Sequence, residues 1–226
     1  LIAWDGREEI LLLSTNLKAS DTTTVLEVMP LPSEPKVKKG DIETFRRAVN
    51  LINQRIYMDK KNKGGRLAEA IMPPPAVITF HEKIGAHDIS VVQLREVNGF
   101  VEWVKNYIES LGFEGDIISE AHKELIEDYI NRGFVWFVFD VITLNKEMKT
   151  IEPIQYRFRT DKLFYPLKIT SLGFGYTTIE LLVLTPKLLS KFSGIPIKRV
   201  QLAHDPITLT KEDLKKIDED MYELLK

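Results

Sequence analysis

The chain has 226 residues, and its 31 basic residues nearly balance 33 acidic ones, which gives a formal net charge of -2. This balance argues against a nucleic-acid-binding protein, because binding to a polyanion needs an excess of Lys and Arg over acidic residues. With Cys at 0, the sequence also excludes disulfides, thiolate zinc sites and a thiol nucleophile.

No stretch of the sequence approaches the roughly 18 uninterrupted apolar residues that a membrane-spanning helix requires. The longest candidate, residues 134–142, contains Asp140 and has the length of a strand. The chain starts at Leu1 in what resembles the middle of a strand, without an initiator Met or a basic leader segment. We expect that a segment upstream has been removed, and a signal peptide, an anchor or a trimmed recombinant sequence would each account for this start.

Apolar patterns in the first quarter of the chain predict strands followed by a helix. The runs 9–14 and 24–29 predict a β-hairpin or two neighbouring strands. Over residues 41–56, apolar side chains recur at alternating steps of three and four, which places them on one stripe of a helix with Asp41 as its N-cap. A helix with one apolar face has to bury it, so we expect this helix to cover a sheet.

A basic, glycine-ended loop at residues 59–65 and three prolines at 73–75 follow this helix. We interpret the lysines of the loop as solvent-exposed rather than as a binding patch. The stretch 58–75 is a candidate boundary between sub-domains, but the expected organisation is one domain over residues 1–226.

Residues 77–94 predict a second hairpin around a two-residue turn at Gly85. The register of this turn pairs opposite charges across the strands and directs large apolar side chains such as Val91 inward. His81 then lies on the outer face and His87 on the inner face, and side chains on opposite faces cannot share one ion. We therefore predict no metal site and no cofactor here.

Two helices are predicted next, at residues 98–111 and 118–131. The second begins near Ser119, a good N-cap residue, and ends at Gly133, which favours the left-handed conformation that stops a helix. In the following run, 134–139, odd and even positions are both apolar, which is typical of a central strand covered on both faces.

The last part of the sequence predicts more strands and a closing helix. The helix begins after a capping box at Thr210, whose hydroxyl and the acidic residue three positions later can exchange hydrogen bonds with the backbone. Together the elements predict an α+β fold, a largely antiparallel β-sheet with 134–139 near its middle and several packed helices. The additional strands are expected at residues 154–159, 167–170, 177–184 and 197–202.

Candidate binding and catalytic residues are few. Arg157 and Arg159 share one face of a predicted strand, with Lys168 in a nearby segment, and this stripe is either an anionic-ligand site or an ordinary solvent-exposed strand face. The glycine-containing segment 173–176 resembles a phosphate loop, but it lies between two predicted strands instead of before a helix, so we interpret it as a turn.

A catalytic site could be assembled only from residues far apart in the sequence. We expect His122 to lie at the edge of the core, and no nucleophile-elbow pattern accompanies it. The least implausible members of a hydrolase-type site are His122, Glu124, His204 and Asp205.

Several segments together resemble an uncharacterised prokaryotic family, domain of unknown function 2330. The resemblance implies extracytoplasmic proteins that are made with a signal peptide and are sometimes tethered to the membrane, and it supplies no catalytic residues. Many bacterial relatives carry cysteines near the N-terminus, which this chain lacks. The segments that carry it are 3–6 (AWDG), 9–11 (EIL), 26–33 (LEVMPLPS), 85–92 (GAHDISVV), the helix around Trp103, 129–134 (YINRGF) and 164–169 (FYPLKI).

These observations favour a non-enzymatic extracytoplasmic binding or scaffold domain, with a hydrolase-type enzyme as the alternative. Its partner is unknown; an envelope protein or a glycan fits the resemblance, and nucleic acid does not fit the charge balance. A third hypothesis is that Arg157, Arg159 and Lys168 bind an anionic ligand.

Overall fold

The computed structural model describes residues 1–14, 23–62, 87–110, 118–144, 152–172, 179–189, 202–203 and 205–226. Helices and strands both occur in this part of the chain, which confirms the predicted α+β class. In chain order, the elements are β1 (Ile2–Trp4), β2 (Glu8–Leu13), β3 (Thr23–Leu31), β4 (Lys36–Lys39), α1 (Ile42–Asn62), β5 (His87–Gln93), α2 (Val97–Ser110), α3 (Glu120–Asn131), β6 (Trp136–Leu144), β7 (Ile154–Arg159), the 3-10 helix η1 (Leu167–Leu172), β8 (Val183–Leu184), α4 (Lys211–Ile217) and α5 (Glu219–Leu225).

The strands form two sheets, and the expectation of one sheet is wrong. The larger sheet has the order β4-β7-β2-β1-β8 and the smaller one the order β3-β6-β5. Neighbouring strands are antiparallel except for β1 and β8, which are parallel. The run 134–139 leads into β6, the central strand of the smaller sheet, so its predicted central position is correct within that sheet.

Alternation along β6 determines what each face of the smaller sheet contacts. Phe137 and Phe139 point to one side and pack in a cluster with Phe100 of α2 and with Ile126 and Tyr129 of α3. Val138 points to the other side, because successive strand residues face opposite ways, and it packs against residues of the larger sheet. A strand that is apolar on both alternations is therefore buried on both faces.

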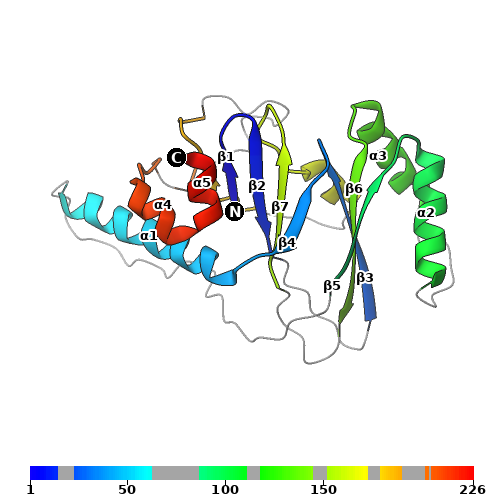
Figure 1. Ribbon diagram of the computed structural model, residues 1–226, viewed down its shortest axis with the longest axis horizontal. Coiled ribbons are helices and arrows are strands. Elements are labelled where there is room, and N and C mark those ends of the chain that lie inside the picture. Colours follow the sequence, from blue (N-terminus) through cyan, green and yellow to red (C-terminus); the bar gives the residue numbers. More distant parts are fainter. Residues whose placement is uncertain are drawn as a thin grey trace.

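The larger sheet is covered on both faces in the same way. Ile10 and Leu12 of β2 face a cluster that includes Ile217 of α4 and Met221 of α5. Leu11, which lies between them, faces the smaller sheet. The result is a four-layer arrangement in which α1, α4 and α5 cover one sheet, α2 and α3 cover the other, and the two sheets face each other (Figure 1).

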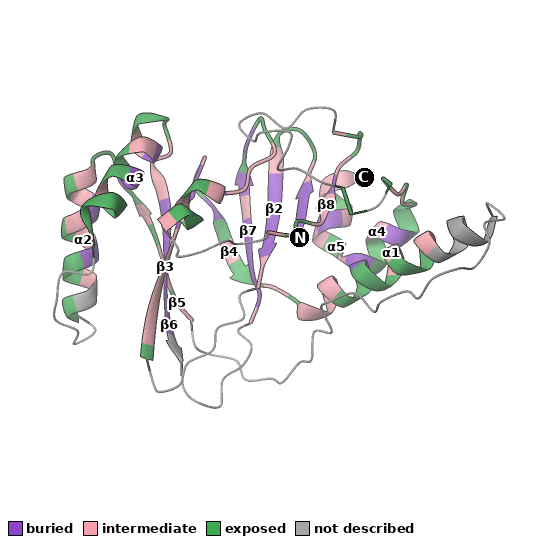
Figure 2. Cartoon of the chain, turned by 180° about the vertical axis from the view of Figure 1, so that it is seen from behind, coloured by how far each residue is buried: buried purple, intermediate pink, exposed green. Residues whose placement is uncertain are grey.

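The space between the sheets holds the central apolar cluster, which we call the inter-sheet core. Its buried members are Ile2, Leu11, Met29, Leu31, Val138, Ile154, Tyr156 and Phe158. The exposed residues of α1 and α2 lie on the outside, whereas buried residues concentrate in the strands between them (Figure 2).

Helix boundaries agree with the capping residues in the sequence. The Asp41 carboxylate accepts a hydrogen bond from the Glu43 backbone at 2.9 Å, and Ser119 is the N-cap of α3. Gly133 has a φ of 88°, and the next residue donates to the Tyr129 carbonyl at 3.0 Å, as in the Schellman motif. The capping box at Thr210 is present.

Three predicted strand features are wrong or incomplete. Residues 167–170 belong to η1, because Thr170 donates its hydroxyl to the Leu167 carbonyl at 2.8 Å and satisfies the backbone locally. Of the predicted strand 177–184, β8 contains only the last two residues in the described part of the chain. Val91 is 37% exposed, although it lies on the same sheet face as the buried Val138. His81, Gly85, the segment 173–176, residues 197–201 and His204 lie outside the described residues.

Gly40 marks a close approach between the chain segments that lead into α1 and β7. Its N–H donates to the Pro153 carbonyl at 2.7 Å. A Cβ atom at this position would lie 3.0 Å from that carbonyl oxygen and would overlap the Leu12 side chain. By contrast, a Cβ at Gly99 in α2 would meet only the Glu96 Cγ atom at 3.8 Å.

We expect the two glycines to respond to alanine with opposite signs. Gly40→Ala should lower the free energy of unfolding by about 1–3 kcal/mol through overpacking, whereas Gly99→Ala should raise it by about 0.5–1 kcal/mol through helix propensity. Urea unfolding of both variants measures this. Equal effects of the two substitutions would contradict the close approach at Gly40.

Candidate functional site

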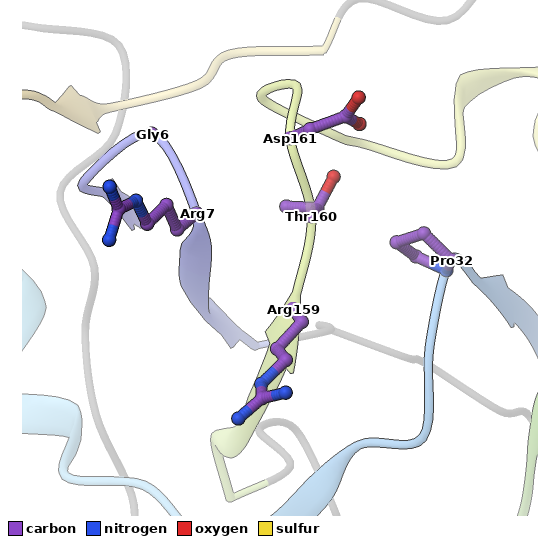
Figure 3. A pocket seen from close by; sticks show the side chains of 6 residues that line it. All are labelled: Gly6, Arg7, Pro32, Arg159, Thr160 and Asp161. Carbon is purple, nitrogen blue, oxygen red and sulfur yellow. The ribbon is translucent and has the colours of Figure 1, made fainter.

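A shallow depression of about 380 Å³ opens where the turn between β1 and β2 meets the C-terminal end of β7 (Figure 3). The segment that follows β3 closes its third side with Pro32. Segments from three distant parts of the sequence therefore build it. The lining residues are Gly6, Arg7, Pro32, Arg159, Thr160 and Asp161.

The first wall of the depression is a tight turn. Gly6 has a φ of 103°, which a residue with a side chain rarely adopts. The Asp5 carboxylate accepts hydrogen bonds from the backbone N–H groups of Arg7 and Glu8, both at 2.7 Å. These bonds fix the turn and leave the Arg7 side chain exposed.

Hydrogen bonds join the end of β7 to this turn and to the segment that follows β3. The Thr160 N–H donates to the Arg7 carbonyl at 2.9 Å. The Ser33 hydroxyl donates to the Arg159 carbonyl and accepts from the Arg159 N–H, both at 2.9 Å. Because Ser33 follows a strand of the smaller sheet and Arg159 ends one of the larger sheet, these bonds also tie the two sheets together at this end.

The charged side chains of the depression do not converge on one point. In Figure 3 the Arg7 and Arg159 side chains leave the depression on different sides, and Asp161 points in a third direction. Within the described part of the chain, neither arginine forms an ion pair with a carboxylate. The depression therefore has two exposed guanidinium groups and one carboxylate, that of Asp161, around an uncharged lining.

The structure separates the three cationic residues that the sequence suggested as a stripe. Arg157 pairs with Glu8 at 2.6 Å, and this hydrogen bond raises the pKa of the guanidinium. Lys168 lies on η1 beside α3 and pairs with Asp128 at 2.8 Å. Of the three, only Arg159 lines the depression. Sequence reasoning missed Arg7, which no local pattern distinguishes from other exposed arginines.

The strand face that carries Arg157 is partly covered instead of open to solvent. Gln155, two positions earlier, is 4% exposed and donates to the Asp220 carboxylate of α5 at 3.0 Å. The C-terminal helix therefore covers part of what the alternation alone indicated as a solvent-exposed face.

The proposed members of a hydrolase-type site are not gathered in the described residues. His122 is exposed, not at the core edge, and its Nδ1 atom lies 2.7 Å from the hydroxyl of the N-cap Ser119. Its position in the first turn of α3 accounts for this contact. Glu124 is also exposed, and His204 lies outside the described part of the chain.

The inter-sheet core contains an ionisable residue that the sequence reasoning missed. Glu9 of β2 is fully buried, and one of its carboxylate oxygens accepts a hydrogen bond from the Phe164 N–H at 2.8 Å. The other oxygen has no hydrogen-bond partner among the residues that the structure describes. Burial raises the pKa of Glu9 to about 8, although the Phe164 hydrogen bond lowers it. Glu9 lies two positions before Leu11 and therefore on the same strand face, and this spacing was the sequence pattern that could have indicated its burial.

A second polar group in this core consists of His87 and Asp140. The His87 Nδ1 atom lies 2.6 Å from a carboxylate oxygen of Asp140, and its Nε2 atom lies 3.1 Å from the Glu152 carbonyl oxygen. The predicted inward position of His87 is confirmed. Both ring nitrogens are engaged, so neither is free to abstract a proton from a substrate. In the described ranges, no three His, Asp or Glu side chains are placed to hold a metal ion.

The protein is a four-layer α+β protein with two facing, mostly antiparallel sheets, and the depression lies at one end of these sheets. Among the described residues, no helix combines the length and apolar character needed to cross a membrane. The chain belongs to the family described as uncharacterized protein conserved in bacteria (DUF2330), whose model matches residues 1–194. No curated protein and no solved structure matches the chain.

The buried carboxyl of Glu9 should make stability depend on pH. Its folded-state pKa of about 8 lies above the ordinary value of 4.5, so the folded protein retains a proton that the unfolded chain releases. The contribution of Glu9 to stability is fully present below about pH 4.5 and is lost as pH rises through 8, by an amount on the order of 4–5 kcal/mol.

Glu9→Gln should remove this part of the pH dependence, because an amide does not ionise. Urea unfolding at several pH values measures the slope for wild type and variant. Glu124→Gln, an exposed position on α3, is the control and should not change the slope. An unaltered slope in Glu9→Gln would show that this carboxyl is not the buried titrating group.

Proposed function

We propose that the chain is a non-enzymatic binding domain of the bacterial cell envelope, and that its depression receives a carboxylate or sulfate of an acidic glycan. The observation that carries this proposal is the pair of exposed arginines, Arg7 and Arg159, at the rim of one depression without an ion-pair partner in the described residues. An extracytoplasmic location is part of the proposal and rests on the family resemblance.

The pairing of other arginines makes this pair unusual. Arg46, Arg47, Arg55, Arg132 and Arg157 each form an ion pair with a carboxylate. Besides the two rim residues, only Arg95 among the described arginines forms none. A guanidinium group binds carboxylate and sulfate groups through paired N–H donors, so two unpaired guanidinium groups beside one depression favour an anionic ligand.

The same geometry limits the kind of ligand. The two guanidinium groups extend to different sides of the depression (Figure 3), so a single small anion does not reach both in this conformation. A polymer with repeated anionic groups can place one group at each arginine. The Asp161 carboxylate in the lining disfavours dense negative charge, which fits a polymer with one carboxylate or sulfate per sugar unit better than a polyphosphate.

Binding to a carboxylated polysaccharide tests the proposal. Wild type should bind polygalacturonate, and more weakly as salt rises, because exposed ion pairs are screened. The Arg7→Gln, Arg159→Gln double variant should bind about two- to thirtyfold more weakly, since each exposed ion pair contributes about 0.2–1 kcal/mol. Affinity is measured by isothermal titration at two salt concentrations.

Arg95→Gln is the matched control, because Arg95 is also exposed and unpaired in the described structure but does not line the depression. Its affinity should equal that of wild type. Absence of binding by wild type, unchanged binding by the double variant, or equal losses in the control would each contradict the proposed site.

A further inference from the structure

We propose that His87 is a proton-dependent latch between the two sheets. In its doubly protonated form it joins Asp140 of the smaller sheet to the backbone at the start of β7 in the larger sheet, and loss of its proton loosens the packing between the sheets. This inference is independent of the proposed function, because it concerns a group inside the inter-sheet core.

The contacts of the imidazole ring favour its doubly protonated form. A backbone carbonyl can only accept hydrogen bonds, so the Nε2 atom that lies 3.1 Å from the Glu152 carbonyl must carry a hydrogen. The Nδ1 atom lies 2.6 Å from a carboxylate oxygen of Asp140, and with a second N–H there the ring donates to both acceptors at once. A neutral imidazole has a single N–H and can satisfy only one of these acceptors.

The latch continues into the larger sheet through Glu152. Its carboxylate pairs with Lys39 of β4 at 2.6 Å, and the following residue, Pro153, accepts the 2.7 Å hydrogen bond from Gly40. The backbone that His87 holds is therefore fixed to the edge strand of the larger sheet. Movement of this segment would be transmitted to the start of β7.

Removing the proton would leave a buried charge without compensation. Asp140 is 4% exposed, and its second carboxylate oxygen has no hydrogen-bond partner in the described residues. His87 is thus the hydrogen-bond donor that the structure shows for this carboxylate. A neutral ring keeps one N–H, so it can no longer donate to both Asp140 and the Glu152 carbonyl, and it loses the positive charge that compensates the buried carboxylate. Deprotonation therefore favours separation of the two sheets at this point.

The other charged and titratable groups around the ring support the protonated form. Glu27 of β3 lies directly across from Asp140 in the strand register, and Tyr156 of β7 lies in the facing sheet with its pKa raised by burial and by Asp140 and Glu27. Burial lowers the pKa of His87, but the hydrogen bond and charge of Asp140, the Glu152 carbonyl and the charge of Glu27 outweigh it and raise this pKa above 6.5.

The latch and the depression lie at opposite ends of the two facing sheets. The start of β5, the end of β6 and the start of β7 lie together at the lower end in Figure 1, whereas the β1–β2 turn and the end of β7 lie at the upper end. The strand register agrees. His87 is opposite Ile142 near the end of β6, whereas Leu31, which precedes Pro32 of the depression, is opposite Trp136 at the start of β6. The latch therefore acts on the sheets at the end away from the depression.

The sign of the pH effect follows from the raised pKa. The stabilisation is fully present below the unfolded value of 6.5 and is lost as pH rises through the folded-state pKa of His87. As pH rises, the unfolding constant of wild type should increase relative to that of His87→Gln. The total increase should be about tenfold for each pH unit that separates the folded-state pKa of His87 from its unfolded value. Glu9 titrates in both proteins, so the difference between them isolates His87.

Two measurements on the full chain test the latch. Nitrogen-15 NMR of wild type at pH 6 should show His87 with both ring nitrogens protonated, and it does not depend on whether a variant folds. Hydrogen exchange should show that the protection factor of the Gly40 amide falls as pH rises through the pKa of His87 in wild type but not in His87→Gln. His122→Gln, which alters an exposed histidine, is the control and should behave as wild type.

Three results would overturn the inference. The first is a neutral imidazole spectrum for His87 at pH 6. The second is an unfolding constant whose pH dependence is the same in wild type and His87→Gln. The third is a loss of the wild-type pH dependence in His122→Gln, which would assign the effect to the wrong histidine.

Discussion

The face-to-face packing of the two sheets is the constraint on which the rest of the structure depends. Each sheet has an apolar side that requires the other sheet and an apolar side that requires helices. Stacked sheets lie about 10 Å apart, so side chains from both fill the space between them and exclude water. Any polar group on these inner faces must therefore find its hydrogen bonds within the protein.

That constraint explains the chemistry of the ionisable residues in the core. Glu9 accepts a hydrogen bond from one backbone N–H and has a pKa of about 8, and the Asp140 carboxylate is hydrogen-bonded to the His87 ring. Each arrangement supplies one hydrogen bond to a buried carboxyl group between the sheets. Both also depend on protons, which is why the stability of the inter-sheet core is linked to pH in the same direction at two separate places.

Local features of the fold could be predicted from the sequence, but the pairing of the layers could not. Ser119, Gly133 and Thr210 mark helix ends through bonds to neighbouring residues, and they were identified correctly. Alternation shows which residues share a strand face, but it does not say whether a helix or a second sheet covers that face. For the same reason the contact of His87 with Asp140, 53 positions away, and the position of Arg7 and Arg159 beside one depression required the tertiary structure.

The C-terminal helices complete the fourth layer although they lie beyond residues 1–194, the part that the family model matches. Ile217 and Met221 are buried against Ala3 and Leu12 of the larger sheet. Arg55 of α1 also pairs with Asp213 of α4 at 2.5 Å, so α1 and α4 are bound to each other as well as to the sheet. This cover keeps the outer face of the larger sheet dry. With that face covered by helices and the other by the smaller sheet, the turn at Gly6 and the end of β7 leave the Arg7 and Arg159 side chains exposed at one end of this sheet.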